Sequence, residues 1–456
     1  MSSVDQSLHD CADLFCQYYD ELDDDVVRRD WLKWELDTSW QSLKLSFYND
    51  VCFGCPVNRL STRVDSLNNR DRRLLAALRG MDEAFRYVNP VMKGNERTPR
   101  GLVALEAYVA ARGRLDCGTN GGALIPRLVR RDDPTDDVNH KRDLFTYVQR
   151  VPQESWERCN VRFLGAAVSL EHSDIQNGFD VACVPVIADP DELHFEIRTM
   201  GDRRFYRIRP RDLAVTRDRI PAIVAALDRS GAMIAVAPEA MLTPALLKCW
   251  QDSLRGRSGS RLRWLLAGTG DLKPTVPPAA NRAVLLDGRT GAVIGEQDKL
   301  FPFNLSNETL KSWNLASRLG GKAAGEDLTK VPTRLTVFDA GAVRLAILIC
   351  EDLNKPLDTG PLIRDLGISH LLVPVFSRAL QKHRWEQAAA SVHVRETGTT
   401  VIVSNSSVMA TILGIATPGT SLVVTPNSSG AAVGYSTDPA VPACFRLLPD
   451  GSAELR

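Results

Sequence analysis

Apolar side chains in the first part of the chain recur at the spacing of amphipathic helices. They are Leu14, Phe15, Tyr18, Leu22, Val26, Trp31 and Trp34, followed later by Leu74, Leu75, Leu78 and Phe85. Intervals of three and four residues place such side chains on one face of a helix. Thr98-Pro99 then offers a helix N-cap followed by proline at the first helical position. The pattern predicts a mainly helical region over residues 1–160.

From about residue 160 onward the pattern changes to short, continuous apolar runs. These runs are residues 181–187, 233–237, 263–267, 283–286, 343–349, 371–375, 401–403 and 422–424. Helical patterns with one apolar face lie between some of them, at residues 220–227, 244–254 and 385–394. Continuous apolar strands are typical of sheets that are covered on both faces. The sequence therefore predicts a layered α/β domain over residues 161–456.

Length and composition are those of an ordinary globular protein. The chain has 456 residues, 44% hydrophobic and 25% charged, with 56 basic and 56 acidic side chains. A net charge of zero argues against a protein that mainly coats nucleic acid or an anionic membrane. No apolar run approaches the roughly 18 residues of a membrane span, and the N-terminus does not resemble a signal peptide. Ten scattered cysteines do not form a disulfide framework, so we expect a cytoplasmic, reduced protein.

The charge is unevenly distributed within the N-terminal region. Residues 1–50 hold twelve acidic and four basic side chains, whereas residues 51–150 hold twelve acidic and eighteen basic ones. Such an asymmetry marks either a segment that binds a protein or nucleic-acid partner or two neighbours that face each other. The sequence leaves both interpretations open.

Three chemically reactive residues each follow directly from a predicted strand. Glu239 follows residues 233–237 and Pro238, Lys299 follows a strand-like run at 292–298, and Cys350 ends the run 343–349. Residues at the ends of strands in layered α/β domains often line a common binding cleft. We therefore expect these three side chains to lie close together.

The three residue types suit acyl transfer from an amide or a nitrile. A thiol on a sharp strand exit becomes a nucleophile when a neighbouring base takes its proton. Glu239 is the candidate base for Cys350. Lys299 is the candidate cation that stabilises the thiolate and the oxyanion of a tetrahedral intermediate.

The motifs around these residues resemble those of the nitrilase, or carbon–nitrogen hydrolase, superfamily. That family carries Glu, Lys and Cys in this chain order, and here they stand as Pro238-Glu239, Lys299 with Pro302, and Cys350-Glu351-Asp352. Flanking segments at residues 281–288, 370–377, 385–404 and 419–426 also resemble the family, so the likeness covers about residues 178–435. It implies an α-β-β-α sandwich, usually assembled into homo-oligomers, with no metal or organic cofactor.

The resemblance also implies further site residues. Many family members have a second glutamate between the lysine and the cysteine, shortly before a tryptophan, and Glu308 with Trp313 is the best match. Thr309 stands where the family has a basic residue. Glu351 and Phe376 are the expected substrate-binding residues. Residues 189–216 lengthen the gap between the first strand and the first helix, and they either lie over the pocket or simply pack on the edge of the domain.

Other candidate sites have simpler explanations. Cys52-Phe-Gly-Cys55 is a lone CxxC motif whose spacing to Cys11 and Cys16 matches no compact zinc module. We interpret it as a turn with two buried thiols and expect no metal site. His370, His383 and His393 are not at metal-ligand spacing and are interpreted as structural or exposed.

The sequence thus predicts a thiol-dependent hydrolase of a non-peptide carbon–nitrogen bond. A small amide is favoured over a nitrile as its substrate, and the thiol would form a thioester intermediate. Two alternatives stay open. One is a nitrilase-like module that senses a ligand or acts as a scaffold with little turnover. The other is a glutaminase or acyltransferase that passes ammonia or the acyl group to another acceptor.

Overall fold

The computed structural model contains two compact units. It describes residues 3–65, 69–92, 96–112, 115–116, 121–128, 140–165, 169–170, 172–211, 214–257, 259–272, 281–328, 334–427, 431–436 and 438–456. Unit 1 comprises Met1–Gly165, Asp339–Arg344 and Leu362–Ile368, and unit 2 comprises Ala166–Phe338, Leu345–Pro361 and Ser369–Arg456. None of the described helices is long and apolar enough to cross a membrane.

Unit 1 is mainly helical, as the apolar spacing predicts. Its helices are α1 (Ser3–Glu21), α2 (Asp24–Glu35), α3 (Thr38–Cys52), α4 (Val57–Asp65), α5 (Arg70–Phe85), α6 (Val103–Arg112) and α7 (Gln153–Glu157), with 3-10 turns η1 (Arg86–Val88), η2 (Arg100–Leu102) and η3 (Lys141–Leu144). Its strands are β1 (Leu115–Asp116), β2 (Ala123–Pro126), β3 (Val148–Val151) and β4 (Cys159–Phe163). Strands β1, β2 and β3 form an antiparallel sheet that the sequence pattern did not predict.

Helices α3 and α5 pack closely because α5 carries a glycine at the contact. A Cβ atom on Gly80 would lie 2.6 Å from the carbonyl oxygen of Lys44 and 2.9 Å from the Cβ of Phe47. The buried Trp40 adds a hydrogen bond from its indole N–H to the carbonyl oxygen of Arg72, at 2.9 Å. The aromatic side chains of this region therefore form a helical core.

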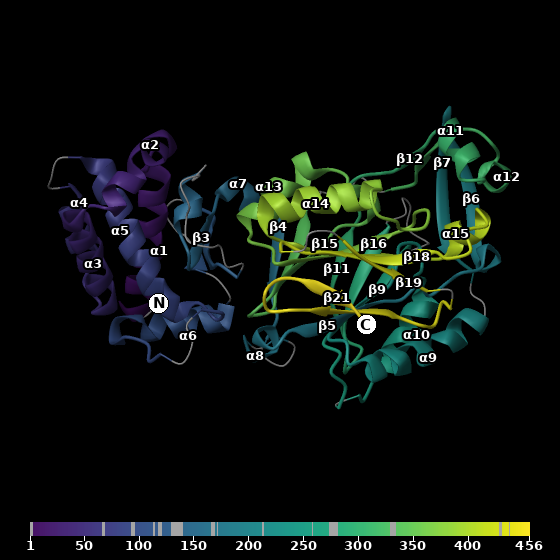
Figure 1. Cartoon of the computed structure of the whole chain (residues 1–456), viewed down its shortest axis with the longest axis horizontal. Coiled ribbons are helices and arrows are strands. Elements are labelled where there is room, and N and C mark those ends of the chain that lie inside the picture. Colours follow the sequence, from purple (N-terminus) through teal and green to yellow (C-terminus); the bar gives the residue numbers. More distant parts are fainter. Residues whose placement is uncertain are drawn as a thin grey trace. The chain divides into compact units, whose positions relative to one another are not determined.

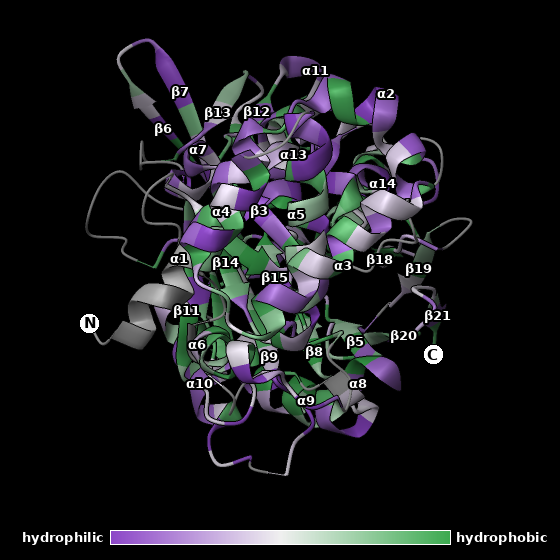
Figure 2. Ribbon diagram, turned by 90° about the vertical axis from the view of Figure 1, so that its left-hand side faces the viewer, coloured by the Kyte–Doolittle hydropathy of each residue, from purple (hydrophilic) through white to green (hydrophobic). Residues whose placement is uncertain are grey.

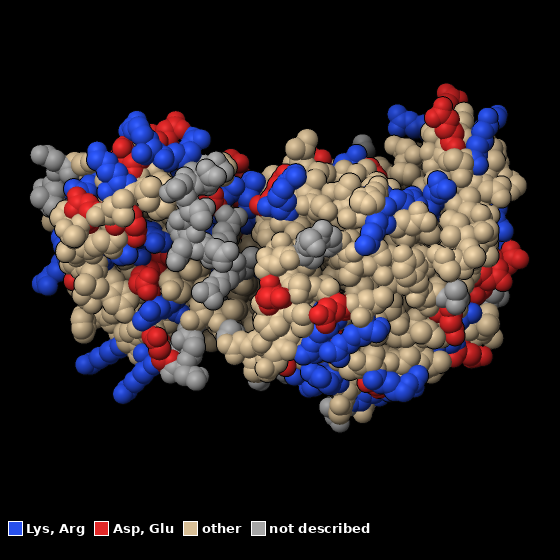
Figure 3. All heavy atoms as spheres, viewed as in Figure 1, with Lys and Arg blue, Asp and Glu red and all other residues tan. Residues whose placement is uncertain are grey.

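The acidic and basic segments of unit 1 pair with each other. Glu21 forms an ion pair with Arg70 at 2.7 Å, and Asp20 forms one with Arg150 at 3.0 Å. Both signs of charge are also visible on the surface of unit 1 (Figure 3). The uneven charge of residues 1–150 is therefore at least partly balanced within this unit.

Unit 2 contains the remaining elements. Its helices are α8 (His172–Gln176), α9 (Ala214–Ser230), α10 (Pro244–Leu254), α11 (Asn307–Ser312), α12 (Ala316–Leu319), α14 (Trp385–Thr397) and α15 (Val408–Ile412), with 3-10 turns η4 (Pro190–Glu192) and η5 (Cys350–Asp352); α13 (Pro356–Asp365) begins in this unit. Its strands are β5 (Phe179–Cys183), β6 (Leu193–Met200), β7 (Arg203–Pro210), β8 (Ile234–Val236), β9 (Trp264–Gly270), β10 (Arg282–Asp287), β11 (Val293–Asp298), β12 (Asn304–Leu305), β13 (Ala324–Glu326), β14 (Leu335–Asp339), β15 (Arg344–Ile347), β16 (His370–Val375), β17 (Thr400–Asn405), β18 (Gly419–Val424), β19 (Ala432–Tyr435), β20 (Ala443–Leu447) and β21 (Ala453–Leu455).

Two sheets stack face to face in unit 2. One has the strand order β11-β10-β9-β8-β5-β20-β21, and the other includes β19-β18-β17-β16-β15-β14. Helices α9 and α10 cover the outer face of the first sheet, and α14 covers that of the second (Figure 1). Strands β8, β9 and β15 are buried along their length. Green, hydrophobic residues are frequent in the region of these strands in Figure 2. The predicted α-β-β-α sandwich is thus confirmed.

A small third sheet extends unit 2 beside the sandwich, with the order β12-β13-β7-β6. Strands β6 and β7 form an antiparallel hairpin within the lengthened segment 189–216. Strand β7 then pairs in parallel with β13, where Phe205 is opposite Gly325 and Tyr206 is opposite Glu326. The inserted hairpin therefore holds the strand that carries Glu326.

Candidate active site

Glu239 lies at the end of β8, in a buried turn. The next residue, Ala240, has a left-handed backbone with φ +61°, which turns the chain sharply after the strand. The Glu239 carboxylate accepts hydrogen bonds from the Nζ of Lys299 at 2.8 Å, the Nδ2 of Asn281 at 2.8 Å and the backbone N–H of Phe376 at 2.9 Å. Burial raises the pKa of Glu239; Lys299 opposes the rise, and the carboxylate of Glu326 adds to it. A carboxylate with a raised pKa is a more effective base.

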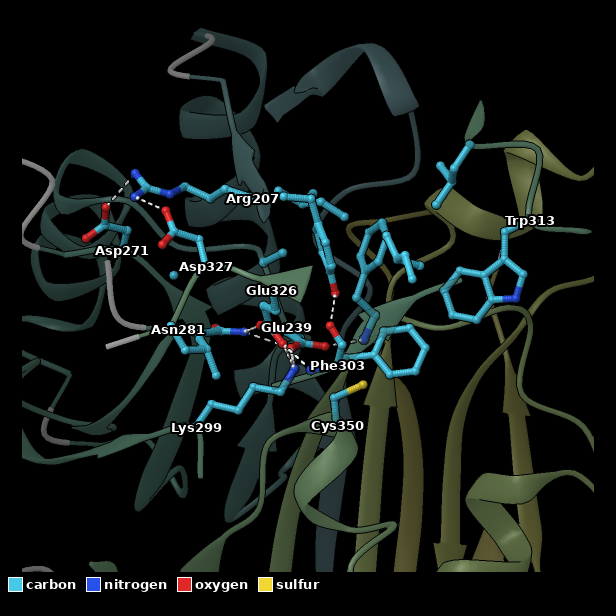
Figure 4. A pocket seen from close by; sticks show the side chains of 18 residues that line it. Arg207, Glu239, Asp271, Asn281, Lys299, Phe303, Trp313, Glu326, Asp327 and Cys350 are labelled. Carbon is cyan, nitrogen blue, oxygen red and sulfur yellow. Dashed lines mark hydrogen bonds and ion pairs between the residues drawn. The ribbon is translucent and has the colours of Figure 1, made fainter. Parts of the chain in front are cut away.

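Lys299 lies directly after β11, between two carboxylates. Its Nζ donates to Glu239 at 2.8 Å and to Glu326 at 2.7 Å, and its side chain is only 1% exposed (Figure 4). Burial disfavours the charged form, but the two carboxylates outweigh burial and hold the pKa of the ammonium well above its usual range. Lys299 therefore stays a cation inside the protein.

Glu326 completes this cluster, and the sequence analysis missed it. It ends β13, and its carboxylate accepts hydrogen bonds from the Nδ2 of Asn281 and the backbone N–H of Phe303, both at 2.9 Å, besides that from Lys299. Strand β13 has only three residues and no apolar alternation. The local sequence therefore carried no strand signal that could have singled out Glu326.

The structure does not bring Glu308 to the cluster. Glu308 is exposed in the first turn of α11, which Ser306 caps by accepting the N–H of Thr309. An acidic side chain is favourable there because it faces the positive end of the helix dipole. The carboxylate that contacts Lys299 besides Glu239 is that of Glu326. Trp313, which suggested the assignment, does line the pocket.

Cys350 begins the turn η5, three residues after the end of β15, and lines the same pocket as Glu239. Its φ of +49° lies in the left-handed region, which costs a non-glycine residue about 1–2 kcal/mol, so the predicted sharp strand exit is present. Burial raises the pKa of the Cys350 thiol well above its usual range, Glu239 adds to the rise, and Lys299 opposes it. The resting pair is thus a neutral thiol beside a base.

A pocket opens over these residues. Its volume is about 60 Å³, and the polar cluster forms only part of its wall. The remaining wall includes the apolar and aromatic side chains of Tyr206, Ile208, Phe303, Leu305, Trp313, Leu315, Leu328 and Phe376. Tyr206 and Ile208 come from β7, so the inserted hairpin lies at the pocket.

The two residues expected to bind substrate lie at the site in different ways. Phe376 lines the main pocket, and its backbone N–H holds Glu239. Glu351 lines a second pocket of about 200 Å³, which also reaches Cys350. The Nζ of Lys355 contacts the Glu351 carboxylate at 3.1 Å. Cys350 therefore lies where two pockets meet.

No group of three or more His, Cys, Asp or Glu side chains among the described residues could hold a metal ion. Cys52 is buried at the end of α3, and Cys55 follows it after a turn. His393 is buried and His370 is half-buried. Desolvation lowers the pKa of His370 to about 4, and it also lowers the pKa of His393. These two histidines are therefore neutral at physiological pH.

Comparison with solved structures gives distant matches. No family model matches the chain, and no curated protein matches it. An amidase from Nesterenkonia sp. is 19% identical with a TM-score of 0.36, over 61% of this chain and 89% of the amidase. A glutamine-dependent NAD+ synthetase from Acinetobacter baumannii is 14% identical with a TM-score of 0.37, over 59% of this chain and only 46% of the synthetase. At TM-scores below 0.5 these likenesses carry no argument of their own.

Proposed function

We propose that this protein is a thiol-dependent hydrolase of a non-peptide carbon–nitrogen bond, with a small amide as its substrate. The observation that carries the proposal is the convergence of the Glu239 carboxylate, the Lys299 ammonium and the Cys350 thiol on one pocket, with the Nζ of Lys299 2.8 Å from Glu239. A base, a cation and a thiol are the three groups that acyl transfer through a thioester needs. The order of these residues along the chain, which resembles the nitrilase superfamily, supports the same reaction.

The reaction starts with attack of the thiol on the amide carbon. Glu239 takes the proton of Cys350 as the sulfur forms a bond to the carbonyl carbon. The oxygen of that carbonyl gains the negative charge, which the ammonium of Lys299 stabilises. The carbon–nitrogen bond then breaks, and the leaving amine takes the proton from Glu239. A thioester on Cys350 remains.

Water releases the acyl group in the second half of the reaction. Glu239 takes a proton from water as the water oxygen attacks the thioester carbon. The carbon–sulfur bond breaks, the carboxylic acid leaves, and the thiolate recovers the proton from Glu239. Glu326 serves as a positioning residue throughout because its carboxylate, like that of Glu239, accepts a hydrogen bond from the Nζ of Lys299.

Intact-mass spectrometry tests this function directly. The protein is mixed with a pool of small amides, quenched in acid, and searched for an acyl adduct that maps to the peptide of Cys350. Cys350→Ala is expected to form no adduct and to lose turnover by about 10⁴-fold or more. Cys249→Ala, which changes a thiol on α10 outside the pocket, should keep both. Equal hydrolysis by wild type and Cys350→Ala would reject the mechanism.

Acyl transfer to an amine is a second candidate function. The second pocket, lined by Glu351 and Trp385, also reaches Cys350 and offers a place for an acceptor. With an added amine, a transferase makes a new amide, whereas a hydrolase makes free acid. The ratio of these two products therefore separates the candidates.

A further inference from the structure

The charged side chains of the main pocket are mostly acidic. Among the described residues that line it, the carboxylates are Glu239, Asp271, Glu326 and Asp327, and the cations are Arg207 and Lys299. Outside the lining, Arg198 contacts Asp327 at 3.1 Å and compensates part of the excess. Even with Arg198 included, the formal charge around the pocket is negative. A partly enclosed cleft of one sign attracts ligands of the other sign.

Arg207 does not offer a free cation to a ligand. Its guanidinium lies between two carboxylates, with contacts of 3.0 Å to Asp271 and 3.2 Å to Asp327, on the side of the cluster away from Trp313 (Figure 4). Its Nε is buried without a hydrogen-bond partner among the described atoms, so a ligand cannot reach this N–H without movement of the wall. Arg207 therefore stabilises the pocket wall. It offers no accessible hydrogen-bond donor to an anionic substrate.

In contrast to Arg207, Asp327 offers a hydrogen-bond acceptor to a ligand. Arg198 and Arg207 both contact its Oδ2, and within the described part of the chain no side chain contacts its Oδ1. The Asp327 side chain is 7% exposed, so a charge–charge contact there is only weakly screened by water. Asp271 also borders a neighbouring pocket that Arg209 and Arg211 line. Among the carboxylates of the pocket, Asp327 is therefore the one that we expect to bind a positively charged group of the substrate.

Aromatic rings line other parts of the same pocket. Tyr206, Phe303, Trp313 and Phe376 line the same pocket, and the rings of Phe303 and Trp313 stack with centroids 5.9 Å apart. We propose that the substrate is an amide with a protonated amine remote from the bond that is cleaved, and that Asp327 binds this amine. The proposal rests on the proposed function, because it names the substrate of the same site.

Three amides of equal chain length test this selection. They end in an ammonium, a methyl group or a carboxylate, and kcat/KM is measured for each with the wild-type protein. The ammonium amide is expected to exceed the methyl amide by ~10-fold or more, with the carboxylate amide slowest. A preference for the methyl or the carboxylate amide overturns the proposal and leaves the hydrolase function standing.

Substitutions then assign the preference to Asp327. Asp327→Asn is expected to bring the ratio of ammonium to methyl amide close to one. Arg198→Gln, which removes a partly exposed cation from Asp327, is expected to raise that ratio by about 2-fold. Asp252→Asn, a matched change on the surface of α10, should leave the ratio as it is. A ratio that stays unchanged in both Asp327→Asn and Arg198→Gln would show that Asp327 does not select the substrate.

Binding to Cys350→Ala separates this proposal from the proposed function. The same three amides are titrated against this variant, and the shift in its Tm is followed. Tighter binding of the ammonium amide supports the cation site even if the wild type hydrolyses none of the three. Equal binding of all three overturns the cation site, whatever the wild type hydrolyses.

Discussion

The carboxylate of Asp352 accepts a hydrogen bond from the backbone N–H of Leu300, at 3.0 Å, and so joins the turn of Cys350 to the loop of Lys299. The same carboxylate also accepts the N–H groups of Phe301 at 2.8 Å and Ile349 at 3.0 Å. Asp352 is fully buried. It therefore fixes the nucleophile and the cation relative to each other without lining the main pocket.

Removing this carboxylate should weaken both the fold and the reaction. In Asp352→Asn the new amide N–H₂ faces backbone donors, so buried N–H groups lose their acceptor. The free energy of unfolding is expected to fall by about 2–4 kcal/mol, and kcat by ~10-fold or more. Denaturant unfolding and steady-state kinetics measure the two effects. Asp358→Asn, an exposed change in the first turn of α13, should alter neither by much.

The effect of Asp352 on stability should depend on pH. Burial raises the pKa of Asp352 to about 7, although Lys299 and the backbone N–H groups oppose the rise. The folded protein therefore holds this proton more tightly than the unfolded chain, in which the carboxyl has its ordinary pKa of 3.8. The resulting stabilisation is complete below the unfolded pKa and is lost as the pH rises through about 7.

Unfolding of wild type and Asp352→Asn across this range checks the pH dependence. The difference in unfolding free energy is expected to be larger near pH ~5 than near pH ~8. A difference that grows toward high pH would mean that the hydrogen bonds lower the carboxyl pKa in the folded state.

A pair of matched substitutions separates the two candidate glutamates. Glu326→Gln removes a charge that contacts Lys299, so kcat is expected to fall by ~100-fold. Glu308→Gln changes an exposed side chain of α11 and should leave kcat within about 2-fold of wild type. Steady-state kinetics with one amide gives both numbers. A larger loss of kcat in Glu308→Gln than in Glu326→Gln would assign the function of the second glutamate to Glu308.

The backbone of Cys350 predicts an unusual order of stability. Its φ of +49° is unfavourable for alanine but costs glycine nothing. Cys350→Gly is therefore expected to be more stable than Cys350→Ala by about 1 kcal/mol, although both lack the nucleophile. Denaturant unfolding of the two variants measures the difference. Alanine as the more stable variant would mean that this turn relaxes when the thiol is removed.

Much of the sandwich could be predicted from the sequence because many of its strands fall within continuous apolar runs. Each predicted run overlaps a strand, and each predicted helical stretch lies within α9, α10 or α14. Lys299 follows β11 directly, and Glu239 and Cys350 lie three residues after the ends of β8 and β15. Their convergence could be predicted for that reason.

The elements that escaped prediction are those that distant partners specify. Strand β13 has three residues, and its pairing with β7 joins segments about 120 positions apart. Strands β1, β2 and β3 are also short. Asp82, a charged residue on α5, is buried because its carboxylate accepts the backbone N–H groups of Thr146, Tyr147 and Val148. The hydrophobic periodicity of the local sequence does not predict any of these contacts.

The parallel pairing of β7 with β13 has a consequence for how this protein can change. One strand of that pair supplies the wall with Tyr206 and Arg207, and the other ends in the carboxylate that holds Lys299. A mutation that remodels the hairpin for a new ligand would therefore be transmitted through the ladder to the lysine. A mutation of the hairpin that changes substrate specificity is therefore expected to change the catalytic rate as well.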